Sequence, residues 1–391
     1  MHLRSLPGAR EVIALLSLAA FTTGVSLRFV EPMLPKLATE FATSISTASM
    51  IVTAFALSYA GAVLVQGPLG DRFGKLRVVT ISTVLTGVSA LACALAWDVG
   101  SLAGLRLLMG IFASASVALG MAYIGDVIAL AERQAVIANF IAGSLLGQTV
   151  GPLFGGAFTD VLGWRASFVT LGVVFVVVSL VLYVRTAAAW PAIGPGRFQP
   201  LSVYRSLVVR RPVRWLAAIG VAETLFFFGA YVFIGALLKV RFDLSFTLIG
   251  LVLAGFGVGG LLYSACVRRL IALLGERGLV AGGGALGAVM FCLIVAAPAW
   301  GWTVPCTIGL GLAFYMIHNT VQMKATEVAP DARGASVALY ASCWALGQAA
   351  GVAAVGLAVA HFGYEPVIIA SGLLFGLLGL WLRGNLHRLR P

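Results

Sequence analysis

Charged residues are scarce in this sequence of 391 residues. Asp, Glu, Lys and Arg together make up 10% of the chain, whereas an average soluble domain has about 25%. Hydrophobic residues make up 60%, and the mean hydropathy is +1.02. This composition excludes an ordinary soluble protein and predicts an all-α integral membrane protein that crosses the bilayer many times.

Cysteine is also rare, and acidic residues are outnumbered. The five cysteines all fall inside apolar segments, and no CxxC or Cys/His spacing is present, so we expect neither a disulfide nor a metal site. The chain has 14 acidic and 26 basic residues and a net charge of +12. That charge alone would suit a nucleic-acid partner. Because the basic residues are spread over the loops between apolar segments, we expect a lipid bilayer as the partner and no nucleic acid.

Twelve apolar segments are long enough to cross a bilayer, which takes about 20 residues each. They lie at residues 11–35, 45–68, 76–97, 100–126, 134–159, 164–185, 213–238, 245–268, 278–298, 302–324, 334–360 and 364–383. The first segment follows two arginines as a signal peptide would, but it is too long for one and contains Arg28 and Glu31. We therefore expect it to stay in the mature protein.

The positions of Lys and Arg predict the orientation. Most of them lie in the termini and the even-numbered loops, and basic loops stay on the cytoplasmic side, so we predict that both termini are cytoplasmic. Arg outnumbers Lys by 22 to 4, which is typical of bacterial genomes rich in G and C and suggests a bacterial inner membrane. The predicted units are an N-terminal six-helix bundle at 1–185, a basic cytoplasmic linker at 186–212 and a C-terminal six-helix bundle at 213–391.

The two halves of the chain resemble each other at a spacing of 200 residues. LGQTVG at 146–151 reappears as LGQAAG at 346–351, and Arg133 is matched by Arg333. Such a repeat predicts two pseudo-symmetric units.

A stripe of small residues marks the fifth apolar segment. Glycines four residues apart give a smooth helix face that a second helix can approach closely. The residues of this GxxxGPxxGG pattern are Gly147, Gly151, Pro152, Gly155 and Gly156.

The loop after the second segment carries the most specific motif. Its key residues are Gly67, Asp71, Arg72, Gly74, Lys75 and Arg77. We expect Gly67 to let two helices touch and Asp71 to cap backbone N–H groups and pair with a nearby arginine, which would latch one conformation. The alternative is an ordinary basic loop, to which Asp71 and Gly74 would add nothing.

This loop resembles the Gly-xxx-Asp-Arg-x-Gly-Arg-Arg motif of the major facilitator superfamily, with Lys75 and Leu76 at the places where two basic residues are commoner. The resemblance implies a major facilitator fold of two six-helix bundles, alternating access and no cofactor beyond a proton gradient. Arg106 with Gly110 resembles a second motif of the superfamily, associated with proton coupling. The glycine-proline pattern of the fifth segment resembles that of its proton-coupled exporters. Both point to the drug–proton antiporter branch.

Several polar residues inside the apolar segments are candidates for the transport site. A charge in a membrane segment is expensive and is retained for function or for a partner. For proton coupling we predict Glu223 first, then Glu31, with Arg106. The alternative for Glu31 and Arg106 is a static ion pair. The predicted substrate cavity comprises Arg28, Glu31, Glu223, His318, Asn319 and Gln322. For His318 a structural, hydrogen-bonded role is an equal alternative.

These features predict a secondary active transporter that exports a small organic molecule by exchange with protons, and we expect a monomer. Proton-coupled uptake of an organic anion is the first alternative, because Arg28 lies where antiporters of the family often carry an acid. An integral-membrane enzyme is a remote alternative, since no segment carries paired His or Asp motifs. The sequence does not name the substrate.

Overall fold

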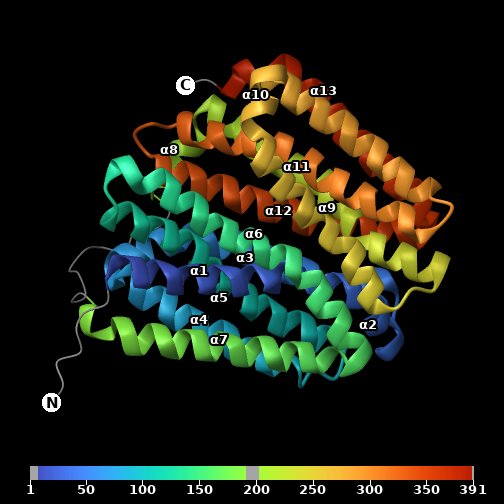
Figure 1. Cartoon of the computed structure of the whole chain (residues 1–391), viewed down its shortest axis with the longest axis horizontal. Helices are drawn as coiled ribbons and strands as arrows, with labels where there is room; N and C mark the ends of the chain where they lie inside the picture. Colours follow the sequence, from blue (N-terminus) through green and yellow to red (C-terminus); the bar gives the residue numbers. More distant parts are fainter. Residues whose placement is uncertain (1–7, 191–201, 390–391) are drawn as a thin grey trace.

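The computed structural model describes residues 8–190 and 202–389, and almost all of them are helical (Figure 1). The first half contains α1 (Ala9–Arg28), η1 (Glu31–Met33), α2 (Leu34–Glu40), α3 (Ile45–Phe73), α4 (Lys75–Cys93), α5 (Val99–Val127), α6 (Leu130–Val161), α7 (Trp164–Thr186) and η2 (Ala187–Ala189). The second half contains α8 (Ser202–Val208), α9 (Arg211–Phe242), α10 (Phe246–Ala296), η3 (Trp300–Trp302), α11 (Thr303–Glu327), α12 (Arg333–Phe362), α13 (Tyr364–Asn385) and η4 (Leu386–Leu389).

Eleven helical segments in the described ranges are long and apolar enough to cross a membrane. One of them, α10, has 51 residues and bends at Gly275, where φ is 60°, so it covers the eighth and ninth predicted segments. The all-α fold with twelve crossings is thus confirmed. The first crossing is interrupted: α1 ends at Arg28, and Pro32 lies in the 3-10 turn η1.

The two halves form two helix bundles that follow the sequence repeat (Figure 1). α6 and α12 are equivalent long helices, and each is followed by a glycine with positive φ, Gly163 at 84° and Gly363 at 79°. A residue with a side chain is strained in that conformation, which explains why both copies of the repeat keep glycine there.

A second helix approaches the glycine stripe of α6 closely, as predicted, and the structure identifies it as α1, including its C-cap, for Gly147, Gly151 and Gly155. A methyl group built on Gly147 would lie 2.1 Å from the carbonyl oxygen of Phe21, and one on Gly151 would lie 2.9 Å from that of Val25. The second half repeats this crossing between α12 and α9, where a methyl group built on Gly347 would lie 2.2 Å from the carbonyl oxygen of Val221. Backbone contact this close requires glycine, so the repeated motif encodes one helix crossing per bundle.

We call the end of the molecule where α1 begins and α13 ends the terminal face, and the opposite end the far face. The bundles touch along the far halves of α6 and α10: Gly156 meets the Phe246 carbonyl, and Gly250 meets the Pro152 carbonyl. At the edge of the far face, Asp160 of α6 accepts hydrogen bonds from the backbone N–H groups of Phe246 and Thr247, at 3.1 and 2.7 Å. A carboxylate of one bundle therefore caps the first turn of a helix of the other.

The short helix α8 joins the bundles near the terminal face. Leu207 is fully buried in the second bundle, whereas the hydroxyl of Tyr204 donates to the carbonyl of Leu64 in α3, at 2.8 Å. Pro68 has no N–H to donate to that carbonyl, so Tyr204 replaces a missing helix hydrogen bond. Of the predicted linker 186–212, residues 191–201 lie outside the described residues. Its boundaries stay a prediction.

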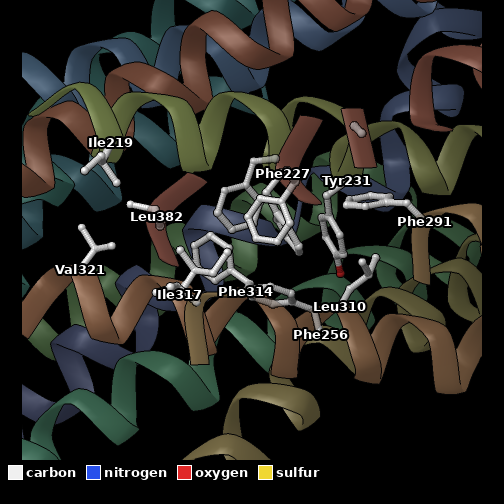
Figure 2. Close-up of a cluster of buried hydrophobic side chains, with 14 of the residues drawn as sticks. Ile219, Phe227, Tyr231, Phe256, Phe291, Leu310, Phe314, Ile317, Val321 and Leu382 are labelled. Carbon is white, nitrogen blue, oxygen red and sulfur yellow. The ribbon is translucent and has the colours of Figure 1, made fainter. Parts of the chain in front are cut away.

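Aromatic side chains fill the core of the second bundle. Phe227 of α9 lies within 5.7 Å, between ring centroids, of Phe256, Phe291 and Phe314 (Figure 2). The ring centroid of Phe375 is 5.1 Å from that of Phe227. These rings come from α10, α11 and α13 and fix the faces of α9 and α11 that carry the polar residues described next.

Candidate functional site

A buried polar cluster lies between α9, α11 and α12. Oε1 of Glu223 is 2.8 Å from Nδ1 of His318 and accepts a hydrogen bond from the hydroxyl of Tyr340 at 2.7 Å. The Tyr340 hydroxyl is also 3.0 Å from the same imidazole nitrogen. The Glu223 side chain is completely buried, whereas that of His318 is 13% exposed. The imidazole is thus the member of the cluster that water can reach.

Aromatic rings hold the imidazole of His318 in place. Phe314, one turn earlier on α11, stacks on it at 5.1 Å with an interplanar angle of 15°, and Tyr340 stacks at 5.7 Å. Packing of this kind fixes the ring orientation and keeps Nδ1 toward Glu223. The cluster therefore brings together two predicted residues, Glu223 and His318, and adds Tyr340, which the sequence analysis missed.

The other predicted cavity residues of α11 lie beside this cluster. Asn319 is half-buried next to His318, and Gln322 is half-buried one turn beyond His318 on the same helix. His318 and Gln322 share a helix face at a spacing of four residues. The polar stripe thus leads from the buried carboxyl toward the terminal face.

A second buried polar group lies at the end of α1. Nη1 of Arg28 donates to Oε1 of Glu31 at 2.7 Å, and the two side chains are 2% and 0% exposed. The guanidinium carbon is 3.8 Å from the ring centroid of Phe228 in α9 and 5.3 Å from that of Phe256 in α10. An ion pair of the first bundle thus rests on the aromatic core of the second.

Arg106 of α5 is buried without an acidic partner in the described part of the chain. Its Nη1 donates to the carbonyl of Ser26 at 3.2 Å, and its guanidinium carbon is 4.1 Å from the ring centroid of Phe55. The static pair with Glu31 that the sequence left open does not form, because Glu31 is held by Arg28.

The predicted gate residues lie at the terminal face. Gly67 makes no contact there between the two bundles. A methyl group built on Gly67 would have no atom within 4 Å, so this glycine does not bring two helices together here. Among the described residues, Asp71 caps no helix and contacts no arginine, so the predicted cap and arginine pair do not form in this arrangement. Asp71 lies 3.7 Å from Lys75, which binds Asp126 more closely, at 2.5 Å. Arg72 is exposed, and the guanidinium carbon of Arg77 is 5.3 Å from the ring centroid of Trp190. Gly74, with φ of 92°, forms the turn between α3 and α4.

The described residues contain no group of three or more His, Cys, Asp or Glu side chains that would suit a metal ion. Asp160 was missed by the sequence analysis. A single Asp at the end of an apolar segment gives no signal, because the helix that it caps begins 86 residues later.

Comparison with known proteins gives one family. A family model described as Major Facilitator Superfamily matches residues 16–352. The efflux pump radE of Floropilus chiversii is 30% identical over 175 residues, which are 44% of this chain and 32% of the pump. The multidrug efflux pump LfrA of Mycolicibacterium smegmatis is 28% identical over 204 residues, which are 52% of this chain and 40% of the pump. The chain thus spans less than half the length of either relative.

The fold is similar to that of solved transporters. A bacterial homologue of the human lysosomal transporter Spinster, solved in an inward-facing and unoccupied conformation, superposes with a TM-score of 0.76 over 99% of each chain, at 16% sequence identity. At this level of identity the similarity concerns the fold alone.

Proposed function

Because the chain belongs to the Major Facilitator Superfamily, we propose that it is a secondary active transporter that exports a small organic molecule in exchange for protons. Export is supported by the two relatives described as efflux pumps. Membership in a family of transporters also speaks against an integral-membrane enzyme.

We place the protein in a bacterial inner membrane with both termini cytoplasmic, on the basis of its basic loops. In this orientation the far face is periplasmic. The contacts between α6 and α10 then close the periplasmic side, while the open surroundings of Gly67 lie on the cytoplasmic side. We propose that this arrangement is an inward-facing conformation, from which the substrate is taken up for export.

The observation that carries proton coupling is the contact of Glu223 with His318 and Tyr340. A carboxyl group in a dry interior favours its neutral form unless a partner stabilises the charge. His318 is such a partner, and it also reaches water. A proton can therefore pass from water through the imidazole to Glu223, or return by the same route, with Tyr340 donating a hydrogen bond to the carboxylate.

The other predicted residues take roles around this cluster. We propose that Asn319 and Gln322 line the path of the substrate on the side of His318, and that Arg28 with Glu31 forms its closed end between the bundles. Arg106 positions α1 by holding the carbonyl of Ser26. The loop with Asp71 acts as a gate that closes in the outward-facing conformation.

Proteoliposomes that enclose a pH-sensitive dye test this function. Cationic, neutral and anionic compounds are added outside, one at a time. With antiport, a transported compound enters while protons leave, so the lumen becomes more alkaline; with symport it becomes more acidic. We expect alkalinisation by at least one compound and none in liposomes without protein.

Glu223→Gln separates coupling from binding. The variant should show no pH change, while the same compound still raises its unfolding temperature in detergent. Glu11→Gln, which changes an exposed carboxylate near the start of α1, is the control and should behave like the natural protein. If the lumen still becomes fully alkaline with Glu223→Gln, this residue is not the proton carrier. If the lumen becomes acidic with the natural protein, the transporter is a symporter and the proposed export by antiport is wrong.

A further inference from the structure

The guanidinium of Arg28 has an edge that no described residue of the protein binds. Its Nη1 donates to Glu31, but Nε and Nη2 are buried and have no hydrogen-bond partner in the described chain. These two atoms lie on one edge of the guanidinium, and their N–H groups point in parallel. This edge matches the two oxygens of a carboxylate in a bidentate pair.

Among the described residues of the first bundle the buried charges do not balance, because Glu31 pairs with Arg28 and leaves Arg106 without an acid. The buried charged side chains of this bundle are Arg28, Arg106 and Glu31, two cations against one anion. Glu223, the other buried acid, belongs to the second bundle and is held by His318 and Tyr340. An uncompensated buried cation is costly, and an anion bound beside it removes much of that cost.

The surroundings of the free edge are apolar. Aromatic rings of the second bundle, Phe228, Tyr231 and Phe256, lie within 5.8 Å of the guanidinium carbon. The hydroxyl of Tyr231 is already used, because it donates to the carbonyl of Leu253 at 2.6 Å. A ligand held by Arg28 therefore meets aromatic surface over the rest of its body.

We propose that the transported molecule is an apolar organic carboxylate, whose carboxylate binds Nε and Nη2 of Arg28 and whose body packs against the aromatic wall of the second bundle. The inference rests on the proposed function, because it names the substrate class of the same transporter. Arg28 lies between the bundles, so their separation during alternating access exposes it, and a ligand that touches both bundles can bias their arrangement.

Binding to the purified protein tests the substrate class without transport. The probes are benzoate, 2-naphthoate and octanoate, each compared with its neutral amide, and thermal unfolding in detergent reports binding. At least one carboxylate should stabilise the protein, and its amide should bind about tenfold more weakly or worse. If no carboxylate binds, or if the amides bind equally well, the proposal is wrong.

Two variants separate ligand binding from a structural role of the ion pair. Arg28→Lys keeps the charge but loses the fork and should weaken carboxylate binding about tenfold or more. Glu31→Gln breaks the same ion pair but leaves the fork and adds net positive charge, so binding should be kept or strengthened. Arg185→Lys, an exposed arginine of α7, is the matched control. Equal losses in Arg28→Lys and Glu31→Gln would assign the pair a structural role only.

A competing inorganic anion is the remaining occupant to exclude. Chloride and phosphate are tested in the same assay, with and without the amides. If either anion raises the unfolding temperature as much as the carboxylates do, and the amides do not change this effect, the edge binds small anions and the proposed substrate class is wrong. The proposed function fails separately. If carboxylates bind but the lumen pH does not change, proton coupling is wrong and the substrate class still holds. If only cationic or neutral compounds make the lumen alkaline, proton coupling holds and the substrate class is wrong.

Discussion

A carboxyl group inside a membrane protein is kept neutral or is given a partner, and Glu223 has two partners with different chemistry. An imidazole nitrogen can donate or accept a hydrogen bond, so His318 suits either form of the carboxyl, whereas Tyr340 donates its hydroxyl to Oε1 of Glu223. We propose that the imidazole passes the proton and that the phenol stabilises the charged form of the carboxyl.

Tyr340→Phe tests this division of roles. The variant keeps the ring that packs on His318 but removes the hydroxyl bonded to Glu223, which makes the charged carboxylate less favourable by about 1–3 kcal/mol. The pH profile of transport should then shift, while substrate binding is retained. Tyr364→Phe, at the start of α13, is the control. An unchanged pH profile of transport in Tyr340→Phe would contradict the role.

At this scale the sequence predicted the residues better than their contacts. Glu223 and His318 stand out as ionisable groups in apolar segments, and Arg28 with Glu31 is a spacing of three that a helix brings together. The contact between Glu223 and His318 joins positions 95 residues apart, which no local periodicity encodes. Tyr340 was missed because a tyrosine in an apolar helix indicates packing as readily as hydrogen bonding.

Whole helices were predictable because the bilayer imposes their length. The apolar segments and the glycine stripe together determine which helices exist and which face of α6 is smooth. The joint between the eighth and ninth segments lies at Gly275, between the two segments that the sequence predicts. Its φ of 60° and ψ of 175° are not helical, so the chain changes direction there.

The crossing of α6 and α1 gives a prediction at the scale of these elements. Gly147→Leu would place a side chain where a Cβ alone lies 2.1 Å from the Phe21 carbonyl, so the helices must separate. We expect lower unfolding temperature in detergent and transport reduced by about tenfold or more, since such overpacking costs about 1–3 kcal/mol or more. The matched control is Leu146→Ile, at the preceding position, where the side chain is 46% exposed. Normal stability of Gly147→Leu would show that the two helices do not need this contact.

The conformation of the whole molecule depends on contacts at its two faces. At the far face, Asp160 joins the bundles through Phe246 and Thr247, and its second oxygen also accepts from the Thr247 hydroxyl at 2.6 Å. At the terminal face, Asp71 is 74% exposed and contacts only its neighbour Lys75 within the described chain. Sequence analysis predicted the gate at the terminal face, because its motif is local. It missed the far-face contact, which exists only once both bundles are assembled.

These two aspartates should shift the conformational balance in opposite directions. Asp160 stabilises the arrangement seen here, in which the far halves of α6 and α10 touch. Asp160→Asn removes the charge from that cap and should favour the alternative arrangement by about fivefold, since hydrogen bonds to a charged group contribute about 1.5–3 kcal/mol and exposure reduces this value. Asp71 does not stabilise the arrangement seen here. If its contacts form only in the alternative arrangement, Asp71→Asn weakens that arrangement and should favour the one seen here.

Spin labels at Val127 and Met323, two exposed residues at the terminal ends of α5 and α11, measure the balance. In Asp160→Asn the population with the shorter distance between the labels should grow, because the terminal halves approach when the far halves separate. In Asp71→Asn that population should shrink. Asp243→Asn, at the far-face end of α9, is the control, since its carboxylate pairs only with Lys239 of its own helix. Shifts of the same sign in the two test variants would mean that the aspartates do not act on opposite conformations. An unchanged distribution in Asp160→Asn would mean that the glycine crossings of α6 and α10 close the far face without the cap.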